Sequence, residues 1–278
     1  MSFCLGAVVW SQALSRSQAI LDARHPLPPS AVRADLSPQA IARGRHLVVV
    51  TDCAACHGAD LTGRPINLSS STLYAPNLTI IAPTISDAAL DRAIRRGLRP
   101  DGRSELAMPS QAYAGFADDD VAAIIGYLRS LPPKGAVRPE LAPGVIARIN
   151  LARGALKPEV VRVAEAKPPI AVGPGFERGR HLAAVACGQC HGTDLRGGGG
   201  APGPDLTVRG YYDRNQFQTL MRTGMGADEE RGLMSETAQA SFSHFTDDEI
   251  DAVFNYLMAR DALIISRHGT SNAVAPSH

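Results

Sequence analysis

Apolar residues recur at helical spacing in three segments of the first half of the chain, and Gly- and Pro-rich stretches separate these segments. The first begins at Pro38, where Ser37 offers an N-cap and proline suits the first helical position. The second follows Asp87, a possible N-cap, and runs to Gly97, a residue type that suits a helix C-terminus. The third begins at the acidic residues 118–120, and its apolar face consists of Val121, Ile124, Ile125 and Leu128. The intervening stretches show no strand alternation, so we expect loops there.

The second half of the chain repeats this pattern in the same order, with loops of different length. Its last helix follows residues 246–249 and carries Ile250, Val253, Phe254 and Leu257. The matched segments are 43–47 with 178–182, 58–61 with 192–195, 76–79 with 204–207, 93–97 with 220–224, and 116–128 with 245–257. Such an ordered series marks a repeated structural unit, and duplication of one domain explains it.

The repeat divides the chain into two helical domains, residues 37–132 and residues 173–262. A Pro-rich linker of residues 133–172 joins them, and residues 145–156 within it could form one amphipathic helix. A linker of this length is expected to lie along the domains rather than to extend freely into solvent. The tail of residues 263–278 is predicted to be disordered.

The first 36 residues form a separate N-terminal segment whose role the sequence leaves open. Its apolar run from Phe3 to Leu14 is shorter than the roughly 20 apolar residues that span a bilayer. The segment also lacks the basic start of a secretory signal. The two interpretations are a frayed helix and the remnant of a signal or membrane anchor.

The pentapeptide Cys-x-x-Cys-His occurs once in each predicted domain. The two copies are Cys53, Cys56 and His57, and Cys187, Cys190 and His191. This motif is the attachment signature of c-type haem, in which the thiols bond to one porphyrin and the histidine ligates the iron. A zinc site would use the thiolates but leave both histidines unexplained. A thioredoxin-like pair would need a βαβ pattern, which is not visible here.

Composition is consistent with the haem interpretation without establishing it. The chain has 278 residues, a formal net charge of +1, 26 glycines, 20 prolines and only 5% aromatic residues. Small domains with so few large side chains have thin cores, which a covalently held porphyrin would complete. The near-neutral charge gives no signal for a nucleic-acid partner. Cys4 is the one cysteine outside the motifs, so no disulfide framework can be drawn.

The motifs and the helices around them resemble the class I cytochrome c family, and the chain looks like a di-haem member with two fused domains. The resemblance implies an all-α fold of two tandem domains, each wrapped around one covalent haem c. It implies that His57 and His191 are the proximal iron ligands. It also implies that the carbonyls of Pro76 and Pro204 accept a hydrogen bond from these histidines. An ordinary loop role for both prolines is the alternative.

In this family a methionine before the last helix supplies the sixth iron ligand. In the first domain that residue is Met108, since Met1 is the only other methionine in this half. Four methionines compete in the second domain, namely Met221, Met225, Met234 and Met258. Met234 is preferred because Leu233-Met234-Ser235 best matches Ala107-Met108-Pro109, although serine replaces the proline. Met221 and Met258 are expected in the core, and Met225 and His244 are the alternatives.

The resemblance implies a di-haem cytochrome that carries electrons between a periplasmic dehydrogenase or membrane redox complex and a downstream acceptor. Because Met/His ligation raises the reduction potential and closes the iron, electron transfer without catalysis is the preferred interpretation. The alternative is a di-haem enzyme, a peroxidase or a sulfur-compound dehydrogenase, with a displaceable sixth ligand in the second domain. The expected partner is a dehydrogenase subunit or a terminal oxidase or reductase. The expected location is the bacterial periplasm, either soluble or anchored through the N-terminus.

Overall fold

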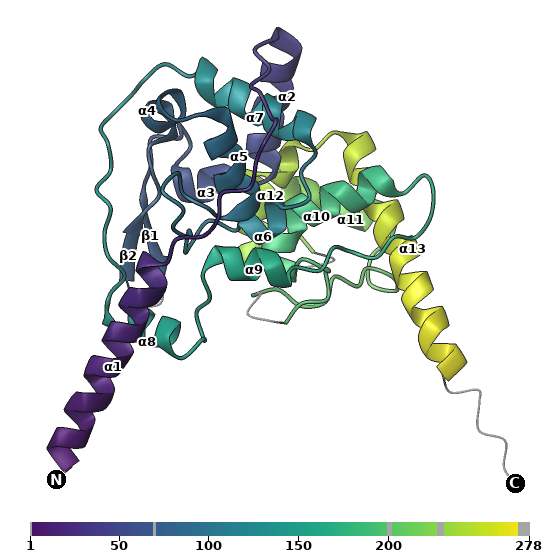
Figure 1. Cartoon of the computed structure of the whole chain (residues 1–278). Helices are drawn as coiled ribbons and strands as arrows, with labels where there is room; N and C mark the ends of the chain where they lie inside the picture. The colour runs from purple at the N-terminus through teal and green to yellow at the C-terminus, as the bar shows by residue number, and fades with distance from the viewer. Residues whose placement is uncertain (1, 69–70, 199–201, 227–230, 272–278) are drawn as a thin grey trace, which may run out of the picture. The chain divides into compact units, whose positions relative to one another are not determined.

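The chain divides into two compact units, each built mainly from helices (Figure 1). The computed structural model describes residues 2–68, 71–198, 202–226 and 231–271. The first unit comprises residues 1–49 and 53–166, and the second comprises residues 50–52 and 167–278. The predicted all-α class is therefore confirmed.

The first unit contains nine α-helices among its described residues. They are α1 (Ser2–Asp22), α2 (Pro38–Val50), α3 (Cys53–His57), α4 (Leu78–Ile81), α5 (Asp87–Arg96), α6 (Ser110–Tyr113), α7 (Asp118–Ser130), α8 (Val145–Ala152) and α9 (Glu159–Glu165), with a 3-10 helix, η1 (Ala82–Thr84), after α4. A two-stranded antiparallel hairpin, β1 (Pro65–Leu68) with β2 (Ser71–Tyr74), occupies a stretch expected to be a loop. Strands of this length are too short for alternation to be visible in the sequence.

The ends of α5 show how local chemistry fixes a helix. Ser86 is the N-cap, and its side chain accepts a hydrogen bond from the backbone N–H of Ala89. Gly97 closes the helix with a φ of +62°, a left-handed conformation that glycine adopts without strain. Asp87 is the first helical residue rather than the expected cap, and its carboxylate pairs with Arg129 of α7 at 2.6 Å. The sequence therefore located this helix correctly and missed its N-cap by one residue.

A glycine lets α2 approach α7 closely. Gly44 lies so near the backbone of α7 that a Cβ there would collide with the carbonyl oxygen of Ala123. The predicted apolar face of α7 is fully buried, and Leu47 and Val48 of α2 are buried as well. The core of the first unit therefore includes the helix that leads to the first Cys-x-x-Cys-His motif.

Two of the helices lie in the segment predicted to be a linker. α8 packs along α1 (Figure 1), where Arg148 donates to the hydroxyl of Ser17 at 3.0 Å. α9 was not predicted, and it packs against α5 and α6. No helix in the described part of the chain is both long and apolar enough to cross a membrane.

The second unit repeats the arrangement of crossing helices. Its helices are α10 (Glu177–His191), α11 (Arg214–Thr223), α12 (Leu233–Ala240), the 3-10 helix η2 (Phe242–His244) and α13 (Asp247–Ser271). Gly179 of α10 occupies the repeat position of Gly44, and a Cβ there would collide with the carbonyl oxygen of Ala252 of α13. The core around this crossing includes Leu182, Ala186, Phe217, Met221, Phe245, Ile250, Val253 and Leu257.

α13 extends further than the sequence analysis expected. It continues to Ser271, into the segment predicted to be a disordered tail, while residues 272–278 lie outside the described residues. Leu263 and Ile264 are half-buried in this extension. Apolar contacts of this kind stabilise a helix beyond its local propensity.

Candidate haem centres

The first Cys-x-x-Cys-His motif forms its own short helix, α3. Cys53 and Cys56 are three residues apart, so both half-buried thiols lie on one face. His57 ends the helix with only 7% of its surface exposed. Asp52, with a φ of +59°, separates α3 from α2. The motif therefore presents two thiols and one buried imidazole from a single turn of chain.

The second motif lies at the end of one continuous helix, α10. Cys187 and Cys190 are also half-buried, and His191 is the last helical residue. Burial raises the pKa of Cys187 to about 12 and raises that of Cys190 as well. Before a haem is attached, burial therefore favours the neutral thiol form of both groups.

Both motif histidines are oriented by a proline carbonyl. Nδ1 of His57 lies 3.0 Å from the carbonyl oxygen of Pro76, and Nδ1 of His191 lies 2.9 Å from that of Pro204. A carbonyl can only accept, so Nδ1 carries the proton and Nε2 keeps its lone pair for a metal. Burial lowers the pKa of His57, although the hydrogen bond to Pro76 opposes this shift. A neutral, oriented imidazole is the form that ligates iron.

A leucine in a strained conformation shapes the loop after each motif. Leu61 has a φ of +58° and Leu195 a φ of +62°, and both side chains are buried. Non-glycine residues rarely adopt such angles. The carbonyl of Leu61 accepts from Leu78 N at 2.9 Å, and that of Leu195 accepts from Leu206 N at 3.0 Å. These bonds bring the two proline carbonyls to their histidines. In the sequence, only the repeat of Asp60-Leu61 as Asp194-Leu195 pointed to a shared structural role for these leucines.

Different residues secure the proline loops in the two units. In the first unit the fully buried Asn77 donates to the carbonyls of Lys134 at 2.7 Å and Ala136 at 3.1 Å. In the second unit the fully buried Arg260 of α13 donates to the carbonyl of Leu195 at 2.7 Å and to Asp205 at 3.0 Å. The sequence analysis identified neither residue. No signal could have revealed Arg260, because Leu131 occupies its repeat position.

Met108 lies in the loop that precedes α6. Its side chain is half-buried, and its carbonyl accepts from the N–H of Ser110 at 2.8 Å. The buried Leu106 lies two residues before it. This placement leaves a thioether on a tightly bonded loop of the first unit.

The four methionines of the second unit occupy different environments. Met221 is in the core, as expected, and Met258 is half-buried against it. Met225 is 37% exposed. Met234, in the first turn of α12, is half-buried and packs against the core of its unit. These environments favour Met234 over Met225 as the candidate ligand.

The donor set of each unit suits an iron porphyrin held through its edge. Two thiols can attach the macrocycle, a neutral imidazole nitrogen can ligate one face of the iron, and a thioether can ligate the other. Gly203 adds a steric indication in the second unit. A Cβ at this position would lie 2.8 Å from Nδ1 of His191, so only glycine allows the histidine this position.

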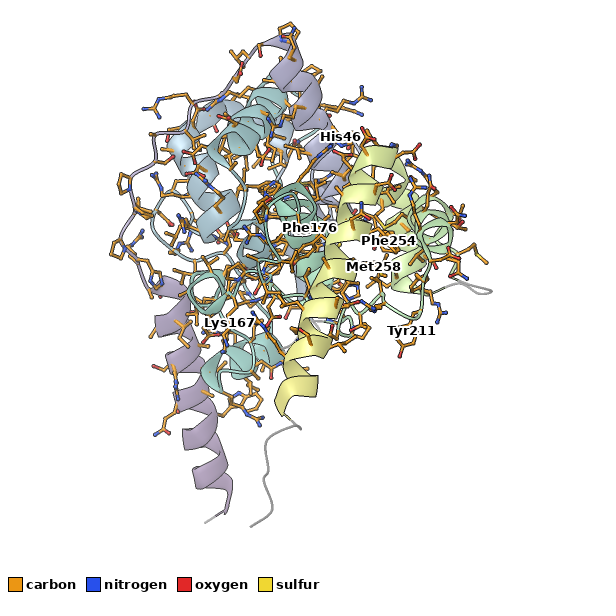
Figure 2. All side chains as sticks on the ribbon, turned by 90° about the vertical axis from the view of Figure 1, so that its right-hand side faces the viewer. His46, Lys167, Phe176, Tyr211, Phe254 and Met258 are labelled. Carbon is orange, nitrogen blue, oxygen red and sulfur yellow. The ribbon has the colours of Figure 1, made fainter. Side chains whose placement is uncertain are left out.

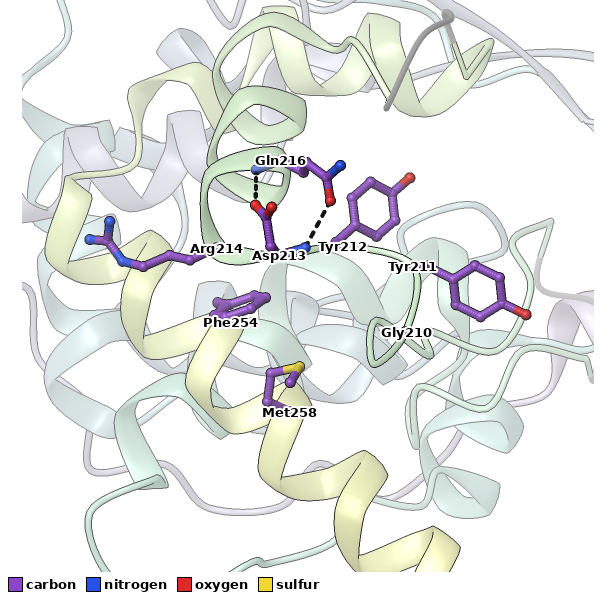
Figure 3. Close-up of a pocket in the computed structure, with 8 residues that line it drawn as sticks. All are labelled: Gly210, Tyr211, Tyr212, Asp213, Arg214, Gln216, Phe254 and Met258. Carbon is purple, nitrogen blue, oxygen red and sulfur yellow. Dashed lines mark hydrogen bonds between the residues drawn. The ribbon is translucent and has the colours of Figure 1, made fainter.

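A surface hollow of about 630 Å³ on the second unit is lined by neither the Cys-x-x-Cys-His residues nor Met234. Phe254 and Met258 of α13 line one side of it, and Tyr211 lies on the loop before α11 (Figure 2). At its edge Asp213 and Gln216 form a reciprocal cap for α11 (Figure 3). The hollow is open to solvent, and we assign it no ligand.

Two repeated helical units, each with paired thiols and an oriented histidine, define a two-haem c-type electron carrier. The chain belongs to the cytochrome c family, whose model matches residues 41–132 and again residues 176–261. The two cysteine pairs, at positions 53/56 and 187/190, therefore hold two covalent haems c.

Several relatives are cytochrome subunits of dehydrogenases. The chain is 28% identical to the fructose dehydrogenase cytochrome subunit of Gluconobacter japonicus, over 89% of this chain and 57% of that protein. It is 25% identical to the gluconate 2-dehydrogenase cytochrome c subunit of Pantoea cypripedii, over 80% and 60%. It is 27% identical to the alcohol dehydrogenase (quinone) cytochrome c subunit of Gluconobacter oxydans (strain 621H), over 82% and 56%. The chain thus spans less than two thirds of the length of each.

Proposed function

We propose that this protein carries electrons between a periplasmic dehydrogenase or membrane redox complex and a downstream acceptor, through two His/Met-ligated haems. The observation that carries the proposal is the pair of equivalent proximal sites, in which His57 and His191 each donate to a proline carbonyl. The names of the relatives, cytochrome subunits of fructose, gluconate and alcohol dehydrogenases, support a dehydrogenase as the electron donor.

The role of the protein is to hold each iron in one coordination geometry. A haem supplies a one-electron exchange between ferric and ferrous iron. His57 and His191 are held by their carbonyl partners and would each ligate one iron, and Met108 and Met234 would supply the second protein ligand of each haem. A closed sixth position keeps substrates from the iron. Fixed ligands also limit the rearrangement that accompanies each electron transfer.

The ligand assignment is tested by replacing the methionines one at a time. Oxidised His/Met haems show a methionine-to-iron charge-transfer band in the red part of the spectrum. We expect Met108→Ala and Met234→Ala each to remove about half of this band and to lower the potential of one haem, since thioether ligation raises it. Met225→Ala is the matched control, and it should keep the whole band.

Two results would contradict parts of the proposal, the first the ligand assignment and the second the electron-carrier function. Loss of the band in Met225→Ala would move the second ligand to Met225. Rapid cyanide binding by the second haem of the unaltered protein, with turnover of peroxide or thiosulfate, would favour the di-haem enzyme. The electron-carrier proposal instead requires that neither haem binds cyanide rapidly.

A further inference from the structure

Glu159 is a fully buried carboxylate at the start of α9, in the segment that the sequence assigned to a linker. A buried charge is costly unless several donors surround it. Its partners lie on both sides of Met108 in the sequence. This arrangement joins the interdomain segment to the loop of the candidate sixth ligand.

The backbone of α9 holds the chain before Met108. The N–H of Glu159 donates to the carbonyl of Glu105 at 2.9 Å. The N–H of Val160 donates to the hydroxyl of Ser104 at 3.0 Å. Two successive residues of α9 thus bond to two successive residues of the loop.

The carboxylate of Glu159 holds the chain after Met108. The backbone N–H groups of Ser110 and Gln111, the first two residues of α6, lie near this carboxylate and favour its charged form. With its side-chain amide turned to the orientation that satisfies both of its ends, Gln111 donates through the side-chain nitrogen to Oε2 of Glu159 at 2.5 Å. Glu159 therefore bonds to the chain three positions before Met108 and three positions after it.

Further contacts fix Glu159 itself. Arg162, one turn later in α9, donates to Oε1 at 2.7 Å. Gly97 at the end of α5 packs so closely that a Cβ there would collide with the Cβ of Glu159. Burial raises the pKa of Glu159 to about 7, while Arg162 and the backbone donors favour the charged form. The residue is therefore held by α5, α6 and its own helix.

The second unit secures its methionine loop in another way. Ser235, beside Met234, donates to the carbonyl of Gly224 and accepts from the N–H of Arg231 at 2.6 Å. Both hydrogen bonds of Ser235 therefore join it to residues just before it in the chain. Only the first loop is tied, within the described residues, to a buried carboxylate from the interdomain segment.

We propose that Glu159 is a positioning residue that holds Met108 on the iron of the first haem. The inference rests on the proposed function, since it takes Met108 as the sixth ligand. An iron–thioether bond is easily displaced unless the loop carrying it is ordered. Removing the shared anchor frees both flanks of Met108, and an external ligand then competes more effectively.

The test uses the full-length holoprotein and imidazole as the competing ligand. We expect Glu159→Ala to increase the affinity of the first haem for imidazole about tenfold or more, equivalent to about 1.4 kcal/mol. Loss of the charge-transfer band reports the displacement. Glu159→Gln keeps one acceptor oxygen and should show a smaller increase. The second haem should respond as in the unaltered protein.

Glu165→Gln is the matched control, because Glu165 lies on the same helix but pairs with Lys157 at the surface. It should leave the imidazole affinity within about twofold. Hydrogen exchange provides a readout independent of iron, and the amides of Ser110 and Gln111 should exchange faster in Glu159→Ala.

Two outcomes separate failure of this inference from failure of the ligand assignment. If Met108→Ala removes its band but Glu159→Ala binds imidazole as the unaltered protein does, Glu159 has no positioning role. If Met108→Ala keeps both bands, the assignment of Met108 is wrong and the inference falls with it. Should Glu159→Ala fail to fold, Glu159→Gln decides the first outcome alone.

Discussion

At the scale of single residues, the proximal histidines depend on backbone carbonyls, and buried polar side chains place those carbonyls. Arg260 is the clearest case, since it has no exposed surface and bonds to the carbonyls of Leu195 and Leu206. It also pairs with Asp205 and Asp261, each at 3.0 Å. Asp205 directly follows Pro204, so Arg260 supports the loop that orients His191.

Replacing Arg260 by methionine should therefore destabilise the second unit. The change keeps the length of the side chain but leaves two carboxylates without their buried cation, at a cost of about 3–5 kcal/mol. Chemical denaturation of the holoprotein measures this loss. Arg209→Met is the control, because Arg209 is exposed, and it should change stability by less than about 0.5 kcal/mol. Equal stabilities for the two variants would contradict this role of Arg260.

At the scale of elements, each unit is organised by a glycine at which two helices cross. Gly44 and Gly179 occupy the same repeat position, and each faces a backbone carbonyl of another helix of its unit, α7 for Gly44 and α13 for Gly179. Sequence periodicity predicted these helices because an amphipathic face is a local property. It could not predict the crossing, since the sequence gives no distance between two helices.

The crossing glycines give a prediction of definite sign. In an exposed helix, alanine is more favourable than glycine by up to about 1 kcal/mol. A Gly→Ala change would therefore stabilise the protein at a site with room for the added Cβ. At Gly44 and Gly179 the collision should dominate, and Gly44→Ala and Gly179→Ala should each destabilise by about 1–3 kcal/mol or more. Thermal unfolding of the holoprotein measures both. Gly115→Ala, where a Cβ meets nothing within 4 Å, is the control. Stabilisation at either crossing would refute the close approach.

At the scale of the whole molecule, the two haems are attached by independent motifs. Changing Cys187 and Cys190 together to alanine should lower the haem content from two to one per chain, since each motif holds one porphyrin. Pyridine haemochrome absorbance relative to protein concentration measures this ratio. Cys4→Ala should retain both haems, because Cys4 belongs to neither motif. Two haems in the double variant would mean that another site attaches the second porphyrin.

The sequence by itself determined the chemistry of this protein and most of its helices. Cys-x-x-Cys-His is a local motif, and the faces of α5 and α7 follow from helical spacing, so neither needs a fold to be recognised. For the carbonyls of Pro76 and Pro204 the residues left a choice between contact with the histidines and an ordinary loop role, and the tertiary structure shows the contact. The contacts of Arg260 with the loop of Pro204, and of Glu159 with the loop of Met108, were visible only in the tertiary structure. Such contacts join residues far apart in the chain, and their geometry depends on how every segment between them folds.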